Sequence, residues 1–221
     1  MFTGPDIVTD GLVLALDAGS KKSYPGSGTT VYDLSGYGNN GTMVNNVYHN
    51  GSAFVFDGNI DYITCGSDTS LDITDAITLT AWVNANSIAA NGHVIGKAQY
   101  GNGYILHHDA VYEGPSGGGF QTTNVDNEAF EWGQNITINK WYYVCYTYDG
   151  STERGYYNDT LINSKSNPGS ISSNAASDLK IGMNSSDCWN GQIAIVNIYN
   201  KALTAQEVLQ NYNATKSRFN L

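Results

Sequence analysis

The chain has 221 residues, including 25 Gly and 16 Tyr, and only 14% of its residues are charged. This composition is typical of short strands joined by tight turns and argues against a helical bundle. Ten basic and 20 acidic residues give a formal net charge of −10, which disfavours nucleic acid and anionic membrane surfaces as partners. Because neither a basic leader nor a long apolar run is present, we expect no signal peptide, no membrane insertion and synthesis in a cytoplasm.

The first strands are predicted from apolar residues that alternate with other residues. Leu12, Leu14 and Leu16 fall on one face of a strand, and residues 77–83 alternate in the same way. Residues 54–56 and 62–64 flank the pair Asp57-Gly58, which predicts a short hairpin or a corner. Residues 94–130 contain short apolar pieces between polar loops, and the sequence does not define their strand boundaries.

Three strands of an antiparallel meander follow. Residues 141–148 are almost all aromatic or β-branched and end at Asp149-Gly150, a pair that tolerates the positive φ of a tight turn. Residues 153–157 run back to a second turn pair, Asn158-Asp159, and residues 160–164 form the third strand. A meander of this kind is the repeating unit of a β-sandwich or jelly roll.

The end of the chain predicts one strand and one helix. Residues 192–199 form the strand, and Thr204 and Glu207 form a capping box that begins the helix. Leu203 and Val208 occupy the positions of a hydrophobic staple. We expect an apolar stripe of the helix to dock on the sandwich, and its members are Val208, Leu209 and Tyr212.

The three cysteines, Cys65, Cys145 and Cys188, are widely spaced and form no C-x-x-C pair. Their odd number and spacing indicate neither a disulfide framework nor a structural zinc site. We expect buried thiols that pack as small hydrophobic side chains.

The amino-acid sequences of several segments resemble one known family. FVFDGNIDYITC (residues 54–65), ITLTAWVNA (77–85) and WYYVCYTYDGSTERGYYNDTLI (141–162) are similar to the concanavalin A-like, laminin-G-like jelly-roll superfamily, and GQIAIVNIYNKALTAQEVLQNY (191–212) is similar to its last strand and helix. The resemblance implies an all-β fold: a two-sheet antiparallel jelly-roll sandwich with a short C-terminal helix. It also implies an N-terminal segment at residues 1–10 and a single domain at residues 11–221.

The opening of the chain, residues 7–42, resembles the start of such domains in structural proteins of tailed bacteriophages. There the domain is fibre, tail or head-decoration material that can engage surface glycans. The resemblance therefore implies a location in the virion, with other virion structural proteins and a cell-surface glycan as partners. The sequence does not define the oligomeric state, and a homo-oligomer is one expectation.

Catalytic patterns are missing from the sequence. Enzymes of this fold that cleave β-glucans resemble one another in an E-x-D-x-E strand, and no such triplet occurs here. Glu128 and Glu131 are three residues apart, so on a strand they point to opposite faces. His107 and His108 are adjacent and also diverge, which disfavours a shared metal ion.

A calcium site is one hypothesis, because the loop DLSGYGNNG offers carboxylate, amide and carbonyl oxygens. Asp33 and Asn39 are the candidate ligands. Related domains add a carboxylate from the final strand, where this chain has Ala194. The alternative is that the two side chains form Asx turns that shape the loop.

Sugar binding requires aromatic faces that stack on a pyranose, with amides or carboxylates that take its hydroxyl groups. Groups of these kinds lie in the irregular middle of the chain: Tyr104, His108, Tyr112, Gln121, Asn124 and Trp132. Tyr104 and His108 share the same parity on one strand. The same composition also fits the recognition of a protein epitope, whereas Trp82 and Trp141 lie in alternating strands and are expected in the core.

Three functions remain as hypotheses. The leading one is a non-enzymatic virion structural protein with a lectin-like carbohydrate-binding domain for adhesion. The second is a purely structural capsid or tail decoration protein that binds no sugar. A glycoside hydrolase or lyase is the third, and the missing carboxylate cluster disfavours it.

Overall fold

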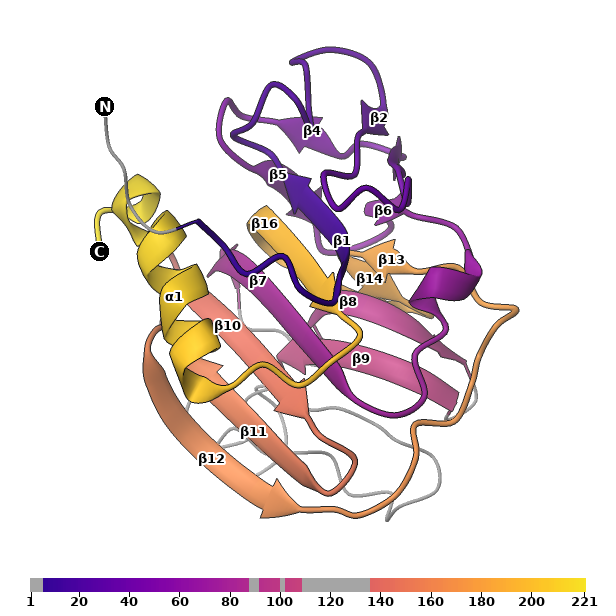
Figure 1. The fold of residues 1–221 in the computed structure, drawn as a ribbon. Helices are drawn as coiled ribbons and strands as arrows, with labels where there is room; N and C mark the ends of the chain where they lie inside the picture. Colours follow the sequence, from indigo (N-terminus) through magenta and orange to yellow (C-terminus); the bar gives the residue numbers. More distant parts are fainter. Residues whose placement is uncertain (1–5, 88–91, 100–101, 109–135) are drawn as a thin grey trace.

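Two antiparallel β-sheets pack face to face in the computed structural model (Figure 1), which describes residues 6–87, 92–99, 102–108 and 136–221. The larger sheet has the strand order β12 (Thr160–Ser166), β11 (Thr152–Tyr157), β10 (Trp141–Tyr148), β7 (Ile77–Ala85), β16 (Asn190–Tyr199), β5 (Phe54–Asp57), β4 (Tyr48–His49). Strands β1 (Leu12–Asp17) and β5 both pair with the same edge of β16. Strand β5 pairs with the first half of β16, and β1 pairs with its second half.

The smaller sheet has the order β2 (Thr30–Val31), β3 (Gly41–Val44), β6 (Tyr62–Thr64), β13 (Lys180–Ile181), β8 (Gly92–Gln99), β9 (Asn102–His108). A separate hairpin is formed by β14 (Met183–Asn184) and β15 (Asp187–Cys188). The described helices are η1 (Thr69–Leu71), α1 (Ala205–Thr215) and η2 (Lys216–Phe219). Together these elements confirm the predicted all-β sandwich with a short C-terminal helix.

The predicted turns set the path of the chain. Gly150 and Asn158 adopt φ values of 87° and 56°, so both turn pairs of the predicted meander form as expected and join β10, β11 and β12. The pair Asp57-Gly58 is a corner rather than a hairpin, because β5 belongs to the larger sheet and β6 to the smaller one.

The space between the sheets holds the main hydrophobic core. One register row of the smaller sheet illustrates its construction: Ile63, Ile181, Ile95 and Leu106 are neighbours across four strands, and all four are buried. Since side chains alternate along a strand, such a row can only face the opposite sheet. Its burial removes a continuous apolar surface from water.

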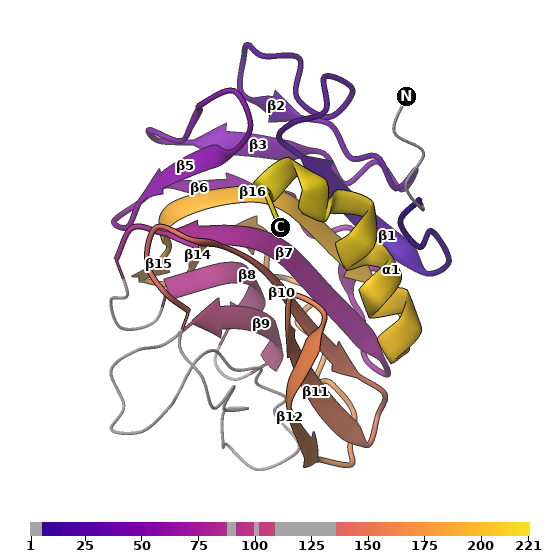
Figure 2. The same ribbon diagram turned by 90° about the vertical axis from the view of Figure 1, so that its left-hand side faces the viewer.

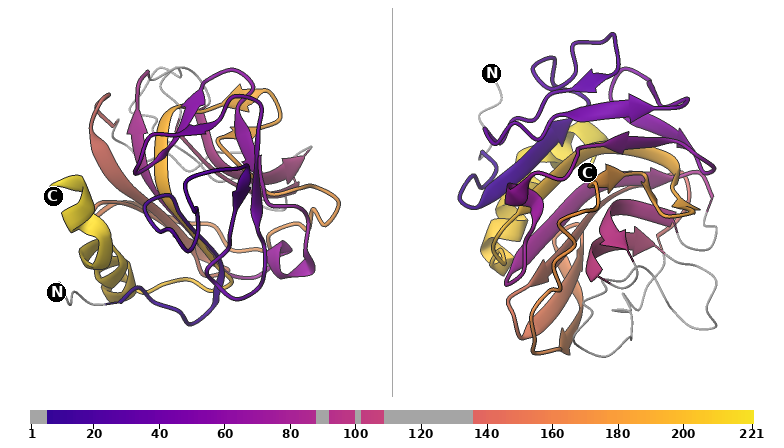
Figure 3. Two further views of the ribbon diagram at one scale, coloured as in Figure 1. Left: turned by 90° about the horizontal axis from the view of Figure 1, so that it is seen from above. Right: turned by 90° about the vertical axis from the view of Figure 1, so that its right-hand side faces the viewer.

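A second hydrophobic layer lies on the outer face of the larger sheet. Figure 2 shows α1 crossing in front of β7, and from above the helix and the smaller sheet lie on opposite sides of the larger sheet (Figure 3). Trp82 stacks on Phe219 with ring centroids 4.0 Å apart, and Trp141 packs against the same ring. Trp82 is fully buried as predicted, and Trp141 is partly buried.

The helix begins with the predicted capping box: Glu207 N donates to Thr204 Oγ1, and Thr204 N donates to Glu207 Oε2. The predicted apolar stripe is wrong at Leu209, which is 40% exposed. Asn211 is buried instead. It lies three residues after Val208, so the two side chains share the helix face that packs on the sheet. Its Nδ2 donates to the Tyr199 hydroxyl, so the buried amide is satisfied.

The three cysteines are free thiols. Cys65 and Cys145 are buried as predicted, and burial raises the pKa of Cys65 to about 12. Cys188 departs from the prediction, because it is only half-buried and its Sγ donates to the carbonyl oxygen of Asn59. No helix in the described part of the chain has the length and apolar character needed to cross a membrane.

Candidate functional site

Most of the predicted sugar-binding residues belong to the segment between His107 and Ile136. These two flanking residues line one pocket. Strand β9 ends at His108, and the description resumes at Ile136. His107 and Ile136 both line an apolar pocket between the sheets, together with Val83, Val94, Leu106, Val144, Tyr157 and Trp189. Tyr112, Gln121, Asn124 and Trp132 lie outside the described residues, and for His108 only the backbone, paired with Gly92, is described.

Tyr104 lies in the core and not on a ligand-facing surface. Its side chain is 1% exposed, and its hydroxyl donates to the carbonyl oxygen of Leu71 at 2.9 Å. Since a buried ring has no free face to stack on a sugar, the expectation for Tyr104 is corrected. The hydroxyl instead fixes the short helix η1 against the smaller sheet.

A polar surface lies on the inward side of β10, β11 and β12, and we call it the β11 face. Tyr146 and Tyr148 point inward from β10, because both belong to the core between the sheets. Glu153 is paired with Tyr148 on one side and with Lys165 on the other, so all three side chains share this face. The remaining inward residues of the two outer strands include Tyr157 and Asn163.

Glu153 is the central charged group of the β11 face and is fully buried. Its Oε1 accepts a hydrogen bond from Asn167 Nδ2 at 2.6 Å, while its Oε2 accepts none of normal geometry from the described residues. Burial raises the pKa of the Glu153 carboxyl, although Asn167, Tyr146 and the charge of Lys165 oppose the shift. The carboxyl group lies in a region of low polarity, where each hydrogen bond that it makes is strengthened.

Tyr148 holds the chain that follows β12. Its hydroxyl lies 2.8 Å from the carbonyl oxygens of both Asn167 and Gly169. Asn167 is thereby fixed through its backbone while its side chain contacts Glu153. The buried part of the β11 face is therefore held by hydrogen bonds. The half-buried Asn163 and Lys165 provide an amide and an ammonium group at its rim.

Among the described residues, the β11 face lacks the pair of carboxyl groups that most glycosidases use. Glycosidases generally use two carboxyl groups on either side of the scissile bond, and Glu153 is the one acidic residue among the inward positions of β10, β11 and β12. Within the same described ranges, His, Cys, Asp and Glu form no group of three or more that could hold a metal ion. This face can hydrogen-bond a ligand, and the inward positions of its three described strands offer no second acid beside Glu153.

The predicted calcium ligands, Asp33 and Asn39, are brought together, and both carboxylate oxygens of Asp33 accept hydrogen bonds from the protein. Asp33 Oδ1 accepts from Ala15 N and Ser35 N, and Oδ2 accepts from the Ser35 hydroxyl and Asn39 N. Asn39 Nδ2 donates to the Val13 carbonyl oxygen. The bond from Ser35 N to Asp33 Oδ1 is an Asx turn, as the alternative prediction has it for Asp33. The Asn39 side chain makes none and instead ties the loop to Val13 and Ser70.

Sequence reasoning missed Glu153, Asn163, Lys165 and Asn167. A signal for Glu153 was present in the hairpin itself. The Asp149-Gly150 turn fixes the register of β10 and β11, which places Glu153 opposite Tyr148. An acidic residue paired with an aromatic residue of an apolar strand is an unusual inward position and marks a polar site.

Two packed antiparallel sheets and a helix on the outer face define a β-sandwich. The family model of the concanavalin A-like lectin/glucanases superfamily matches residues 57–209. The chain therefore belongs to this superfamily. No curated protein sequence matches it.

Solved structures with the same fold include carbohydrate-binding proteins. Domain 4 of AbnA, a GH43 extracellular arabinanase from Geobacillus stearothermophilus in complex with arabinotriose, is 16% identical with a TM-score of 0.68, and the match covers 91% of this chain and 98% of that domain. The ligand-binding domain of botulinum neurotoxin serotype D in complex with N-acetylneuraminic acid is 17% identical with a TM-score of 0.65.

Botulinum neurotoxin type C, whose cell entry depends on interaction with two ganglioside molecules, is 15% identical with a TM-score of 0.69. In both toxin comparisons the match covers 94% of this chain and 52% of the toxin chain. The chain thus spans about half the length of these toxin structures and nearly the whole of the arabinanase domain.

Proposed function

We propose that the chain is a non-catalytic carbohydrate-binding domain. The observation that carries this proposal is the polar β11 face on a sandwich of the concanavalin A-like lectin/glucanases superfamily. The β11 face contributes an amide and an ammonium group at its rim. His107 and Ile136, which flank residues 108–135 in the sequence, both line one pocket. The arabinotriose complex of the arabinanase domain, matched over 98% of its length, supports the same function.

In the proposed mechanism the domain recognises a sugar without cleaving it. Trp132 and Tyr112 stack on the apolar face of a pyranose or furanose ring, and His108, Gln121, Asn124 and Asn163 hydrogen-bond its hydroxyl groups. A single site of this kind binds at roughly millimolar to micromolar Kd, about −4 to −8 kcal/mol. Many copies on one particle raise the avidity.

Isothermal titration with oligosaccharides selected on a glycan array tests the proposal. We expect W132A and Y112A to abolish binding, and N163A to weaken it. The matched control is Y48A, because Tyr48 is 58% exposed on β4, at the opposite edge of the larger sheet from β12. Loss of binding in Y48A, or full binding in W132A and Y112A together, contradicts this placement of the site.

We further propose that the domain is a virion component made in the host cytoplasm. The likeness of residues 7–42 to phage structural proteins supports this location, and assembly with other virion proteins or with further copies of the chain follows from it. Electron microscopy of labelled particles tests the proposal. Label at the tail tip supports adhesion, an even covering of the capsid supports decoration, and particles without label contradict it.

Calcium binding at Asp33 and Asn39 stays a prediction. Its test is the Tm of the wild type and of D33N, each measured with calcium and with a chelator. A calcium-dependent rise that is lost in D33N supports the site. The same Tm in both solutions for the wild type contradicts it.

Release of sugar from polysaccharides by the purified protein would contradict the non-catalytic function.

A further inference from the structure

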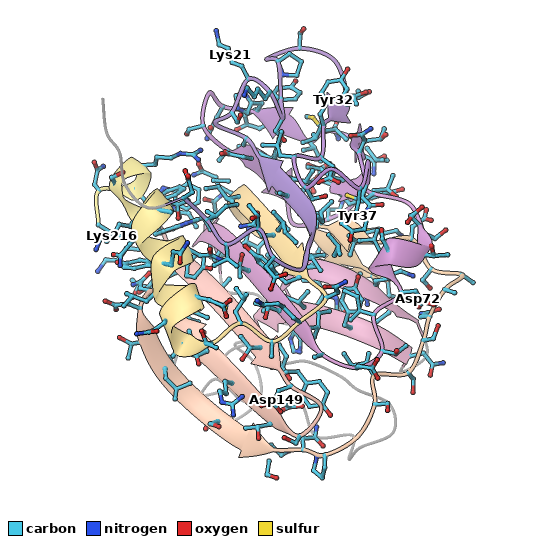
Figure 4. All side chains as sticks on the ribbon, viewed as in Figure 1. Lys21, Tyr32, Tyr37, Asp72, Asp149 and Lys216 are labelled. Atoms are coloured by element: carbon cyan, nitrogen blue, oxygen red, sulfur yellow. The ribbon has the colours of Figure 1, made fainter. Side chains whose placement is uncertain are left out.

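We propose that Asn50 is a modification site whose chemistry is built into the turn between β4 and β5. The backbone nitrogen of Gly51 attacks the Asn50 side-chain amide, His49 acts as the general base, and the amide becomes a carboxylate. The turn is remote from the β11 face: Figure 1 shows β4 in the upper part of the molecule, and Figure 4 shows Asp149, directly after β10, in the lower part. This modification is therefore independent of sugar binding.

The Asn50 side chain is the group that is attacked, and the turn holds it by both of its polar atoms. Its Oδ1 accepts hydrogen bonds from Ser52 N at 3.1 Å and from Ala53 N at 3.0 Å. Donors in this position stabilise the negative charge that develops on a carbonyl oxygen when a nucleophile adds to its carbon. The Nδ2 atom donates to Gln192 Oε1 at 2.8 Å. The amide is therefore polarised and kept in one orientation.

Gly51 supplies the nucleophile. Its φ is 107°, in the region that favours glycine, and no atom beyond its chain neighbours lies within 4 Å of the place that a Cβ would take. The amide nitrogen is therefore not shielded by a side chain of its own residue. It belongs to the residue directly after Asn50, so the attack is intramolecular and closes a cyclic imide.

His49 is suited to act as the base because its contacts define its tautomer. Nε2 lies 2.9 Å from the carbonyl oxygen of Ala18, which can only accept, so Nε2 carries the hydrogen. Nδ1 therefore presents a lone pair, and it accepts the hydrogen bond of Gly51 N at 3.3 Å. The rings of Tyr24 and Phe54 pack against the imidazole, with centroids 4.9 Å and 5.8 Å from its own. The base thus already contacts the proton that the reaction removes.

The reaction needs water and no other reagent. His49 Nδ1 takes the proton of Gly51 N, whose electron pair forms a bond to Asn50 Cγ while the carbonyl electron pair moves to Oδ1. That pair then returns and breaks the Cγ–Nδ2 bond, and Nδ2 takes a proton from solvent and leaves as ammonia. The imidazolium returns its proton to water.

Water then adds to either carbonyl carbon of the cyclic imide and opens it to aspartate or isoaspartate. Both products carry a new negative charge and lack the Nδ2 donor to Gln192. Isoaspartate also lengthens the main chain between β4 and β5, where the backbone N of Asn50 donates to the carbonyl oxygen of Ala53. The modification therefore weakens the attachment of the edge strand β4.

Other Asn-Gly pairs of the chain provide internal controls, and they begin at Asn40, Asn91, Asn102 and Asn190. Gly103 N donates to the carbonyl oxygen of Ser172, which is not a base. Gly41 and Gly191 are buried within β3 and β16. Asn91 lies outside the described residues. Among the pairs that the structure describes, the amide after Asn50 is the one that contacts an imidazole.

Incubation of the native protein in neutral buffer, followed by peptide mapping and mass spectrometry, tests the proposal. The chain unfolded in guanidinium chloride gives the rate of each Asn-Gly pair without the fold. We expect the native protein to convert Asn50 first, and faster than the unfolded chain does. Slower conversion of Asn50 in the native protein than in the unfolded chain overturns the proposal, because the turn then protects the amide.

A variant of the base sharpens the test. H49Q keeps a side chain that can donate to Ala18 and accept from Gly51, but glutamine is not a base. We expect H49Q to slow the conversion of Asn50 at least about tenfold and to leave Asn190 unchanged. The matched control is Y48Q, at the preceding position, where Tyr48 is 58% exposed. An unchanged rate in H49Q, or an equal loss in Y48Q, overturns the proposal.

Discussion

Trp82 Nε1 donates a hydrogen bond to Thr215 Oγ1 at 2.8 Å, across the contact between β7 and the C-terminal end of α1. The indole ring is also stacked on Phe219, so one side chain joins the outer face of the larger sheet to both C-terminal helical elements. Because Trp82 is fully buried, its N–H group has no access to water. The hydroxyl of Thr215 is therefore required to satisfy it.

The first prediction concerns this hydrogen bond. T215V removes the acceptor and leaves the buried indole N–H unsatisfied, which we expect to lower the free energy of unfolding by about 1–3 kcal/mol. T215S keeps the hydroxyl and is the matched control, with a much smaller loss. Urea denaturation followed by tryptophan fluorescence measures both variants. Equal stability of T215V and T215S contradicts the prediction.

The second prediction concerns pH and the buried Glu153. Its folded-state pKa is raised above the ordinary Glu value, first by burial. Below the pKa of Glu153 in the unfolded chain, this residue is protonated in both the folded and the unfolded state. As the pH rises towards the folded-state pKa, Glu153 ionises first in the unfolded state, and this stabilises the unfolded state relative to the folded one. We therefore expect the wild type to lose stability relative to E153Q as the pH increases through this window. Denaturation curves at a series of pH values measure the difference.

Glu207 provides a control of opposite sign. Partial burial would raise its pKa, but hydrogen bonds from Lys201 and Thr204 lower it overall. The ionised Glu207 stabilises the folded state above its unfolded-state pKa, and this contribution is lost as the pH falls. The wild type should therefore gain stability relative to E207Q as the pH increases. A trend of the same sign for E153Q and E207Q would show that the assignment of Glu153 is wrong.

The third prediction compares two glycines with similar backbone angles. Gly182 and Gly150 have φ values of 85° and 87°, so alanine meets the same backbone strain at both positions. At Gly182 an added Cβ would also lie 2.4 Å from the ring of Phe56, whereas at Gly150 the nearest atom is 3.7 Å away. We expect G182A to be less stable than G150A by about 1–3 kcal/mol. Similar Tm values for the two variants would refute this.

The strands of the meander could be predicted because local sequence determines them. Residues 141–148 are suited to a pleated surface, and the two turn pairs accept positive φ at Gly150 and Asn158. The capping box of Thr204 and Glu207 is equally local. In each case the residues that specify the structure are within a few positions of one another.

The wrong assignments depend on contacts between distant segments. Parity places Tyr104 and His108 on one face of a strand, but it does not say which face meets the core. The helix sequence favours Leu209 over Asn211, yet Asn211 is buried because Tyr199 and Val8 lie within hydrogen-bonding distance of its amide. Only the packing of the sheets and the helix decides these cases.

The last prediction concerns the reactivity of the thiols. Cys65 and Cys145 are fully buried, whereas Cys188 is half-buried on β15. Partial burial and then the charges of Asp57, Asp187 and Asp61 raise the pKa of Cys188, so its reactive thiolate is scarce at neutral pH.

We therefore expect a thiol-specific alkylating reagent to modify the native protein once, slowly, and faster as the pH increases. Intact-mass spectrometry follows the reaction, and peptide mapping assigns the modified residue to Cys188. The unfolded chain should react at all three cysteines, and native C188S should not react on the same time scale. Rapid modification of Cys65 or Cys145 in the native protein would mean that the sandwich opens readily around these thiols, contrary to their burial in its two hydrophobic layers.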